Sequence, residues 1–284
     1  MSPVVAVTGP AGTVGREVVR ELLARGVQVR ALDPDPGRIG RAFGNAVEAV
    51  EFEFGIPSTY AAAFRGVDRL FLMRPPHITD VEHLIHPAVR AAIREGVGHV
   101  VFLSLQGVEK NRVVPHAKIE KYLVNLGLPY TMLRPGFFMQ NLVTTHRQDI
   151  ISGEILVPAG HGRTSFVDVR DIAAVAALAL TEPGHEFRAY EITGSEALTY
   201  DEAARILSSV LGRRVQYRNP SPWRFWRAMR ARGHPPGFVL VMIALYTVCR
   251  LGLAARVTGE TERLLGRRPI SFAQFAHDYR YSWT

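Results

Sequence analysis

The N-terminal part of the chain opens with a short apolar run that gives way to apolar residues at helical spacing. Residues 4–7 are all apolar and the run stops at Gly9. The apolar positions that follow recur every three or four residues, at Val14, Val18, Val19, Leu22 and Leu23. A β-branched run bounded by glycine is typical of a buried strand, and the helical period is typical of an amphipathic helix. The pattern predicts a strand, a tight turn and a helix.

The same alternation continues to Pro135. We expect further strands over residues 27–32, 46–54, 67–73, 99–104 and 130–133, and helices over residues 58–65, 80–95 and 115–126. Strands that alternate with helices form an α/β, doubly wound parallel sheet, and ligands bind at the carboxyl ends of its strands. In this chain those ends are the loops at Thr8, Asp33, Arg74, Ser104 and Arg134.

Beyond Pro135 the alternation weakens. We expect a helix over residues 137–151, a short strand over 165–168, and a helix capped by Asp168 or Asp171. Thr199 and Glu202 have the spacing of a capping box, so Glu202 is interpreted as structural.

Two domains are predicted from this change of pattern. We expect residues 1–152 to form the α/β domain with the parallel sheet, and residues 153–284 to form a smaller, mostly helical lobe. The chain is expected to cross back to the first domain around residues 164–182.

Composition narrows the class of protein. The 284 residues are 47% hydrophobic and 21% charged, without repeats, as in ordinary globular proteins. Cys249 is the only cysteine, which excludes an internal disulfide framework and a thiolate metal cluster. The first residues lack the pattern of a signal peptide, and we expect a cytoplasmic protein.

The net charge of +8 is spread along the chain, so we do not expect a nucleic-acid partner. Arginines are densest over residues 224–232, beside the aromatic residues Trp223, Phe225 and Trp226. A membrane or an acidic partner could contact such a helix, but we favour a solvated face with its aromatic residues packed inward. The apolar run 237–255 contains Arg250, and we favour a buried helix over a membrane span.

The glycine turn carries the first candidate chemistry. Gly9, Gly12 and Gly15 are evenly spaced between the predicted strand and helix, where small residues let the backbone approach a pyrophosphate. Asp33 ends the second strand and can accept hydrogen bonds from the hydroxyls of an adenosine ribose. The alternative is a glycine-rich turn that binds no nucleotide.

Taken together, these motifs resemble the NmrA-like branch of the atypical short-chain dehydrogenase/reductases, over nearly the whole chain. The resemblance is carried by the turn from Thr8 to Gly15, residues 66–72, Ser104-Leu105-Gln106-Gly107, His116-Ala117-Lys118-Ile119-Glu120, residues 130–141, Val169-Arg170-Asp171-Ile172 and residues 265–269.

The resemblance implies a Rossmann domain that binds NAD(P) and a small C-terminal lobe. Members include NAD(P)H-dependent reductases of quinones or other small molecules, and redox-sensing regulators without turnover. The implied cofactor-binding residues are Thr8, Gly9, Gly12, Thr13, Val14, Gly15, Asp33, Glu53, Arg74, Pro75, Ser104, Gln106, Pro135, Gly136 and Phe137. Among them, Glu53 falls beside the adenine, Arg74 and Pro75 beside the nicotinamide ribose, and the last five at the nicotinamide. The expected substrate-binding residues are Phe138, Gln140, Asn141, Trp223 and Trp226.

Two departures from the superfamily change the expected chemistry. A carboxylate at Asp33 repels the 2′-phosphate of NADP, although Arg38 or Arg41 could contact that phosphate, and we favour NAD. The catalytic Tyr-x-x-x-Lys pair falls on Arg112 and His116, so no tyrosine is present to protonate an alkoxide.

The lack of this tyrosine favours a quinone-like or conjugated acceptor, because its reduction gives a stabilised anion that does not need a strong proton donor. His116, expected to titrate near neutral pH, is the candidate catalytic residue, and the alternative is a histidine that only bonds its own loop. His77, His83 and His86 complete no known metal pattern, and no metal is expected. A redox-sensing regulator without turnover is the alternative function, and a nucleotide-sugar epimerase is least favoured. For partners we expect a small-molecule substrate, and we keep open a second copy in a homodimer and a regulated protein.

Overall fold

The computed structural model describes residues 3–284, which fold into two compact units. One unit comprises the chain up to Pro135 together with Val169–Ile192, and the other comprises Gly136–Asp168 and Thr193–Thr284. The sequence places the division at residues 152/153 and the return around 164–182, whereas the compact units divide after Pro135 and the chain returns over Val169–Ile192. Residues 1–2 of the predicted first domain lie outside the described residues.

The first unit contains a seven-stranded parallel sheet in the order β10-β6-β5-β4-β1-β2-β3. Its strands are β1 (Val4–Thr8), β2 (Gln28–Asp33), β3 (Glu48–Glu51), β4 (Arg69–Leu72), β5 (His99–Leu103), β6 (Tyr130–Pro135) and β10 (Arg188–Ile192). Crossovers run outward in both directions from β1, so the α/β doubly wound sheet predicted from the alternation is confirmed. The carboxyl ends of β1 and β4 are neighbours at the point where the strand order reverses.

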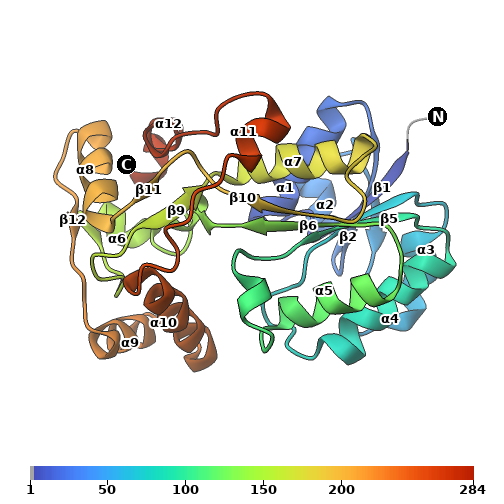
Figure 1. The fold of residues 1–284 in the computed structure, drawn as a ribbon, viewed down its shortest axis with the longest axis horizontal. Helices are drawn as coiled ribbons and strands as arrows, with labels where there is room; N and C mark the ends of the chain where they lie inside the picture. The colour runs from blue at the N-terminus through green and yellow to red at the C-terminus, as the bar shows by residue number, and fades with distance from the viewer. Residues whose placement is uncertain (1–2) are drawn as a thin grey trace. The chain divides into compact units, whose positions relative to one another are not determined.

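Helices cover both faces of this sheet (Figure 1). Helix α1 packs against α7 on one face, and α3, α4 and α5 lie together on the other. The helices of this unit are α1 (Thr13–Ala24), α2 (Pro36–Phe43), α3 (Tyr60–Phe64), α4 (Val81–Arg94), α5 (Pro115–Asn125) and α7 (Val169–Thr181), with 3-10 turns η1 (Pro57–Thr59) and η2 (Val108–Lys110). The helical period read from Val14 to Leu22 lies on the buried side of α1, as predicted.

The second unit combines two small sheets with helices around its own core. Its strands are β7 (Phe137–Phe138), β8 (Glu154–Ile155), β9 (Thr164–Val167), β11 (Ala197–Leu198) and β12 (Gln216–Tyr217), in the orders β11-β9-β7 and β12-β8. Its helices are α6 (Arg147–Ile151), α8 (Tyr200–Leu211), α9 (Pro222–Ala231), α10 (Pro236–Arg250), α11 (Glu260–Leu265) and α12 (Phe272–Asp278), with 3-10 turns η3 (Met139–Leu142) and η4 (Arg280–Trp283). The core is rich in large aromatic side chains, among them Phe225, Phe272, Phe275 and Trp283.

Local signals in this unit are confirmed where they concern helix ends. Thr199 and Glu202 form the predicted capping box at the start of α8, with Glu202 Oε2 accepting from the Thr199 amide at 2.8 Å. The single helix expected over 137–151 is wrong. Phe137 and Phe138 instead pair with β9, because the backbone groups that a helix would use are taken by that neighbouring strand.

Two expectations about exposure are also wrong. Trp223 was expected to pack inward, but it is 67% exposed on α9. The run 237–255 was expected to be a buried helix, but α10 buries only one side, through Val239, Met242, Tyr246 and Cys249. No helix within residues 3–284 has the length and apolar character needed to cross a membrane.

Candidate functional site

The glycine turn after β1 is closed by backbone atoms that leave no room for side chains. Gly9 has φ +62°, in the left-handed region, and its carbonyl accepts a hydrogen bond from the Gly12 amide at 3.0 Å. A Cβ atom at Gly15 would lie 2.1 Å from the Gly9 oxygen. Two of the three predicted glycines are therefore required by geometry, one for its φ angle and one for its close approach.

The first turn of α1 presents amides without a protein acceptor at its cap. Gly12 is the N-cap residue, it supplies no side-chain hydrogen bond, and no acidic residue lies in the first turn. The first amides of a helix have no intrahelical partner, and together with the helix dipole they favour an anion. A pyrophosphate would fit the cradle at Gly9, Gly12 and Gly15, and its binding there stays a prediction.

Thr8 and Met73 support this turn from the neighbouring strand. The Thr8 hydroxyl accepts a hydrogen bond from the Met73 amide at 2.7 Å and lies 3.2 Å from the carbonyl oxygen of Phe71. The Met73 methyl group lies 2.3 Å from where a Gly9 Cβ would be. Thr8 thus uses its hydroxyl to join β1 to the end of β4, and Met73, which sequence reasoning missed, packs over the turn.

Asp33 is buried at the end of β2, at the expected position for a ribose-binding carboxylate. Its Oδ1 accepts from the Asp35 amide at 3.0 Å, and Arg38 Nη1 lies 3.6 Å from the same oxygen. Arg41 is paired with Asp35 at 3.3 Å instead. Of the two arginines considered from the sequence, Arg38 is therefore the one beside Asp33. Glu53 is exposed in the loop after β3.

Arg74 follows β4, and its charge acts on His116 in the first turn of α5. Arg74 donates to the carbonyls of Pro75 at 2.9 Å and Ile78 at 2.6 Å, which fixes its own loop, while its buried Nε has no partner within residues 3–284. Burial and the nearby Arg74 charge lower the pKa of His116 to about 4. The expectation that His116 titrates near neutral pH is wrong, because its environment disfavours the imidazolium. The neutral ring still has one N–H to donate.

The ends of β5 and β6 form the other predicted edge of the site. The Ser104 amide donates to the Leu133 carbonyl at 2.7 Å, and the Gln106 amide donates to the Pro135 carbonyl at 3.0 Å. Gln106 Nε2 donates to Glu191 at 3.2 Å. The Ser104 hydroxyl is buried and has no hydrogen-bond partner among the described residues. A buried, unpaired hydroxyl at a strand end is suited to a polar ligand.

An ion pair beside this edge was missed by sequence reasoning. Arg134 donates to the two carboxylate oxygens of Glu120 at 3.0 and 2.6 Å, and the hydrogen bond to Glu120 raises the pKa of Arg134. Glu109 lies 3.7 Å from the same guanidinium. The pair joins α5 to β6. The sequence does not single out this pair, because α5 also contains Lys118 and Lys121.

The predicted substrate residues of the second unit have different surroundings. Phe137 and Trp226 are half-buried and pack against the same core cluster, and Phe138 is half-buried in β7. Gln140 is buried and donates to Asp168 at 2.8 Å, so its amide is engaged within the lobe. Asn141 is half-buried and accepts from the His146 amide through its carbonyl. Trp223 stands apart on the exposed side of α9.

A buried polar network that the sequence did not reveal lies inside this unit. Tyr246 and His146 Nε2 are 2.5 Å apart, and Asp149 lies 3.5 Å from His146 Nδ1 and 2.5 Å from Arg232. Burial opposes ionisation of Asp149, but hydrogen bonds from His146 and Arg232 outweigh it and lower its pKa. The network connects α6, α9 and α10.

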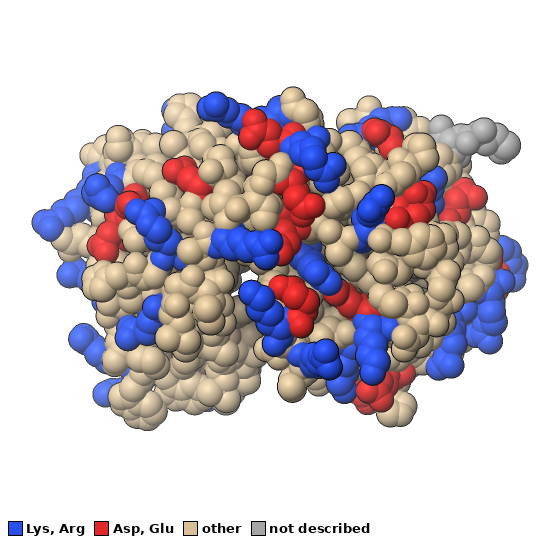
Figure 2. Space-filling view, in the orientation of Figure 1, with Lys and Arg blue, Asp and Glu red and all other residues tan. Residues whose placement is uncertain are grey.

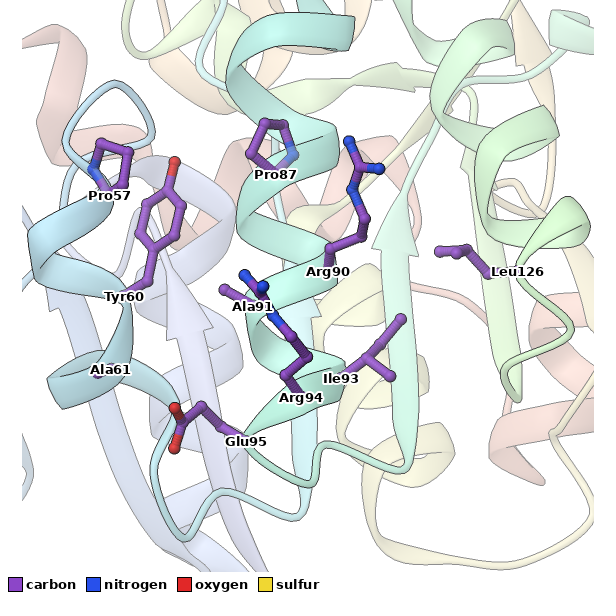
Figure 3. Close-up of a pocket in the computed structure, with 10 residues that line it drawn as sticks. All are labelled: Pro57, Tyr60, Ala61, Pro87, Arg90, Ala91, Ile93, Arg94, Glu95 and Leu126. Carbon is purple, nitrogen blue, oxygen red and sulfur yellow. The ribbon is translucent and has the colours of Figure 1, made fainter.

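One surface pocket lies away from this chemistry (Figure 3). It has a volume of about 690 Å³ and is lined mainly by the C-terminal half of α4, including Arg90 and Arg94, with Tyr60 and Leu126 at its sides. These helices lead into the amino ends of the strands, opposite the edge where ligands bind in such sheets. Within residues 3–284 no cluster of three histidine, cysteine or acidic residues could hold a metal ion.

Comparison with known proteins agrees with this geometry. The model of the NmrA-like family matches residues 1–249. An NAD(P)H azoreductase of Xenophilus azovorans is 33% identical over 276 residues, which cover 96% of each chain.

Two solved structures are also similar to this chain. Triphenylmethane reductase of Citrobacter sp., complexed with NADP(H), has a TM-score of 0.83 at 28% identity and covers 98% of this chain and 99% of its own. An NADPH-dependent quinone oxidoreductase of Escherichia coli, complexed with NADPH, has a TM-score of 0.88 at 24% identity over 97% and 99%, a likeness that concerns the fold alone. The chain therefore belongs to the NmrA-like family.

Proposed function

We propose that this protein is an NAD(P)H-dependent reductase that transfers hydride to a quinone-like or otherwise conjugated small molecule. The observation that carries the proposal is the glycine cradle at the start of α1, whose cap offers backbone amides and no competing carboxylate. The relatives support it, because an azoreductase and a triphenylmethane reductase are named for azo and triphenylmethane compounds rather than for simple ketones or alcohols.

The residues present fit a nicotinamide dinucleotide. The amides of Thr13, Val14 and Gly15 would bind the pyrophosphate, Asp33 would accept from the adenosine ribose, and the unpaired Ser104 hydroxyl would face the nicotinamide end. The bound cofactor supplies hydride, and reduction of a quinone by hydride leaves a phenolate that takes its proton from water.

His116 is proposed as a hydrogen-bond donor rather than as an acid. With a pKa of about 4 it is uncharged at neutral pH, so it can orient a ligand oxygen through its N–H but cannot deliver a proton from an imidazolium. Arg112 replaces the superfamily tyrosine and is exposed. The site is thus suited to acceptors whose reduction needs positioning more than acid catalysis.

We propose that NAD(H) is preferred over NADP(H). The buried Asp33 carboxylate would repel a 2′-phosphate, and Arg38, 3.6 Å away, already compensates that carboxylate. The NADP(H) and NADPH of the two compared structures belong to those proteins.

Turnover against a panel of naphthoquinones, azo dyes and triphenylmethane dyes tests the proposal. The Gly12→Val variant should lose most NADH oxidation, because the added side chain occupies the cradle 3.2 Å from the Gly9 carbonyl. Gly259→Ala is the matched control, since a Cβ there meets nothing within 4 Å.

Tight cofactor binding without turnover of any acceptor would instead favour a redox-sensing regulator. Two observations favour it: the lack of the Tyr/Lys pair, and the basic segment near Arg224 as a possible surface for a protein partner.

A further inference from the structure

Helix α10 is apolar on both of its sides, but the second unit covers only one of them. Its exposed side carries Phe238, Leu240, Val241, Leu245 and Val248, each between 39% and 58% exposed. No charged residue interrupts this side before Arg250, and the exposed apolar surface continues beyond the helix at Leu251 and Leu253. We call these seven residues the α10 face. An exposed apolar surface of this continuity marks an interaction site.

The segment of the chain that contains the α10 face has many arginines and no acidic residue. Between Glu202 and Glu260 there are ten arginines and no acidic residue. Figure 2 shows the result at the lower left, where α9 and α10 lie in the view of Figure 1: tan surface edged with blue, and no red.

Helix α9 packs beside α10 and adds an amphipathic edge to this face. Trp223 is two-thirds exposed at the start of α9. Arg232 is paired with Asp149, and Arg230 donates to a backbone carbonyl. Arg224 and Arg227 are exposed and form no ion pair with any of residues 3–284.

We propose that the α10 face and the arginines of α9 dock this protein onto the surface of an anionic lipid bilayer. An exposed apolar helix side flanked by arginines and a tryptophan is the arrangement by which helices lie in the headgroup region of a membrane. Helix α10, at 15 residues, is suited to lying in that region rather than crossing it.

The charge distribution decides against the other occupants of this surface. In a two-fold dimer the same patch meets itself, so the arginines of one copy would meet a stretch of the other, residues 203–259, that contains no acidic residue. Protein interfaces also carry about one hydrogen bond per 100–200 Å², whereas Thr247, the exposed polar side chain of α10 before Arg250, donates its hydroxyl hydrogen to the Ile243 carbonyl of its own helix. Acyl chains need no such bonds, and anionic headgroups match the arginines.

Sedimentation of the full chain with vesicles tests the proposal without cofactor or substrate. Binding is expected to vesicles of phosphatidylcholine mixed with phosphatidylglycerol, to weaken as salt is raised, and to be much weaker on phosphatidylcholine alone. Arg224→Glu/Arg227→Glu, and separately Leu240→Gln/Leu245→Gln, should each lower the partition coefficient by about tenfold or more. Lys121→Glu/Arg188→Glu is the charge-matched control and should bind like the parent, because both residues are exposed in the first unit.

Three results would overturn the proposal. The first is equal sedimentation with and without anionic lipid. The second is a dimer, seen by light scattering, that both α9–α10 variants dissociate while vesicle binding is absent. The third is a raised KM for a water-soluble quinone in Leu240→Gln/Leu245→Gln with unchanged vesicle binding, which would make the α10 face a wall of the substrate site. Thermal melts of each variant distinguish loss of lipid binding from loss of folding.

Discussion

The smallest change that tests the glycine turn is Gly15→Ala, which adds one methyl group. Its Cβ would lie 2.1 Å from the Gly9 carbonyl oxygen and 2.8 Å from the Gly9 carbon, whereas ordinary contact begins at 3.4 Å. Both neighbours are backbone atoms, so no side-chain rotation can relieve the overlap. The glycine turn and the start of α1 must therefore move apart by more than 1 Å, because the Cβ has to retreat from 2.1 Å to about 3.4 Å from the Gly9 oxygen.

This separation should weaken both folding and binding. Overpacking of this kind costs about 1–3 kcal/mol, which lowers the melting temperature by roughly 2–4 °C per kcal/mol in a chain of this size class. The amides that face the pyrophosphate move with the turn, so NADH affinity should fall by about tenfold or more.

Calorimetric titration with NADH and a thermal melt on the same sample measure the two effects. Gly259→Ala, with no atom within 4 Å of the new Cβ, should change neither. If Gly15→Ala binds NADH as tightly as the parent protein and melts at the same temperature, the reasoning about the cradle is refuted.

Three further predictions follow from the first unit. Replacing Asp33 with Ser should shift the ratio of kcat/KM for NADPH over NADH upward by about tenfold, because Arg38 is released toward a 2′-phosphate; an unchanged ratio would exclude Asp33 as the selective residue. Arg134→Met leaves the buried Glu120 without its bidentate partner and should cost about 2 kcal/mol or more in urea unfolding. The double variant Glu120→Gln/Arg134→Met should recover part of that loss, since a buried unpaired charge is worse than none. His116 has a folded pKa of about 4 against 6.5 in the unfolded chain, so the unfolded state takes up its proton first as the pH falls. Stability should therefore decline from pH 6.5 toward 4, and His116→Gln should flatten that decline; an identical pH dependence in the variant would show that His116 is not desolvated.

The sequence predicts elements whose signals are local. The run before Gly9, the helical period after it and the capping box at Thr199 each depend on neighbouring residues, and the structure contains all three. Strand β10 was missed because it pairs with β6, more than fifty residues earlier in the chain, and its own five residues are only partly apolar.

The candidate site shows the same division. The glycine spacing could be predicted from the sequence because a tight turn between a strand and a helix requires residues without a side chain. Asp33 could be predicted because it is the residue that ends an apolar strand. The pKa of His116 could not, because it depends on burial and on Arg74, which the fold brings near. The exposure of Trp223 and of one side of α10 depends likewise on how much of each helix the second unit covers.

The central claim is that the start of α1 holds a nicotinamide dinucleotide, and calorimetric titration of the purified protein with NADH and NADPH separately tests it most directly. The account predicts saturable binding of one cofactor per chain, tighter for NADH, followed by turnover of a quinone or dye on the same sample. Absence of binding by either nucleotide would contradict it, because nothing else in the proposed reductase could then supply the hydride.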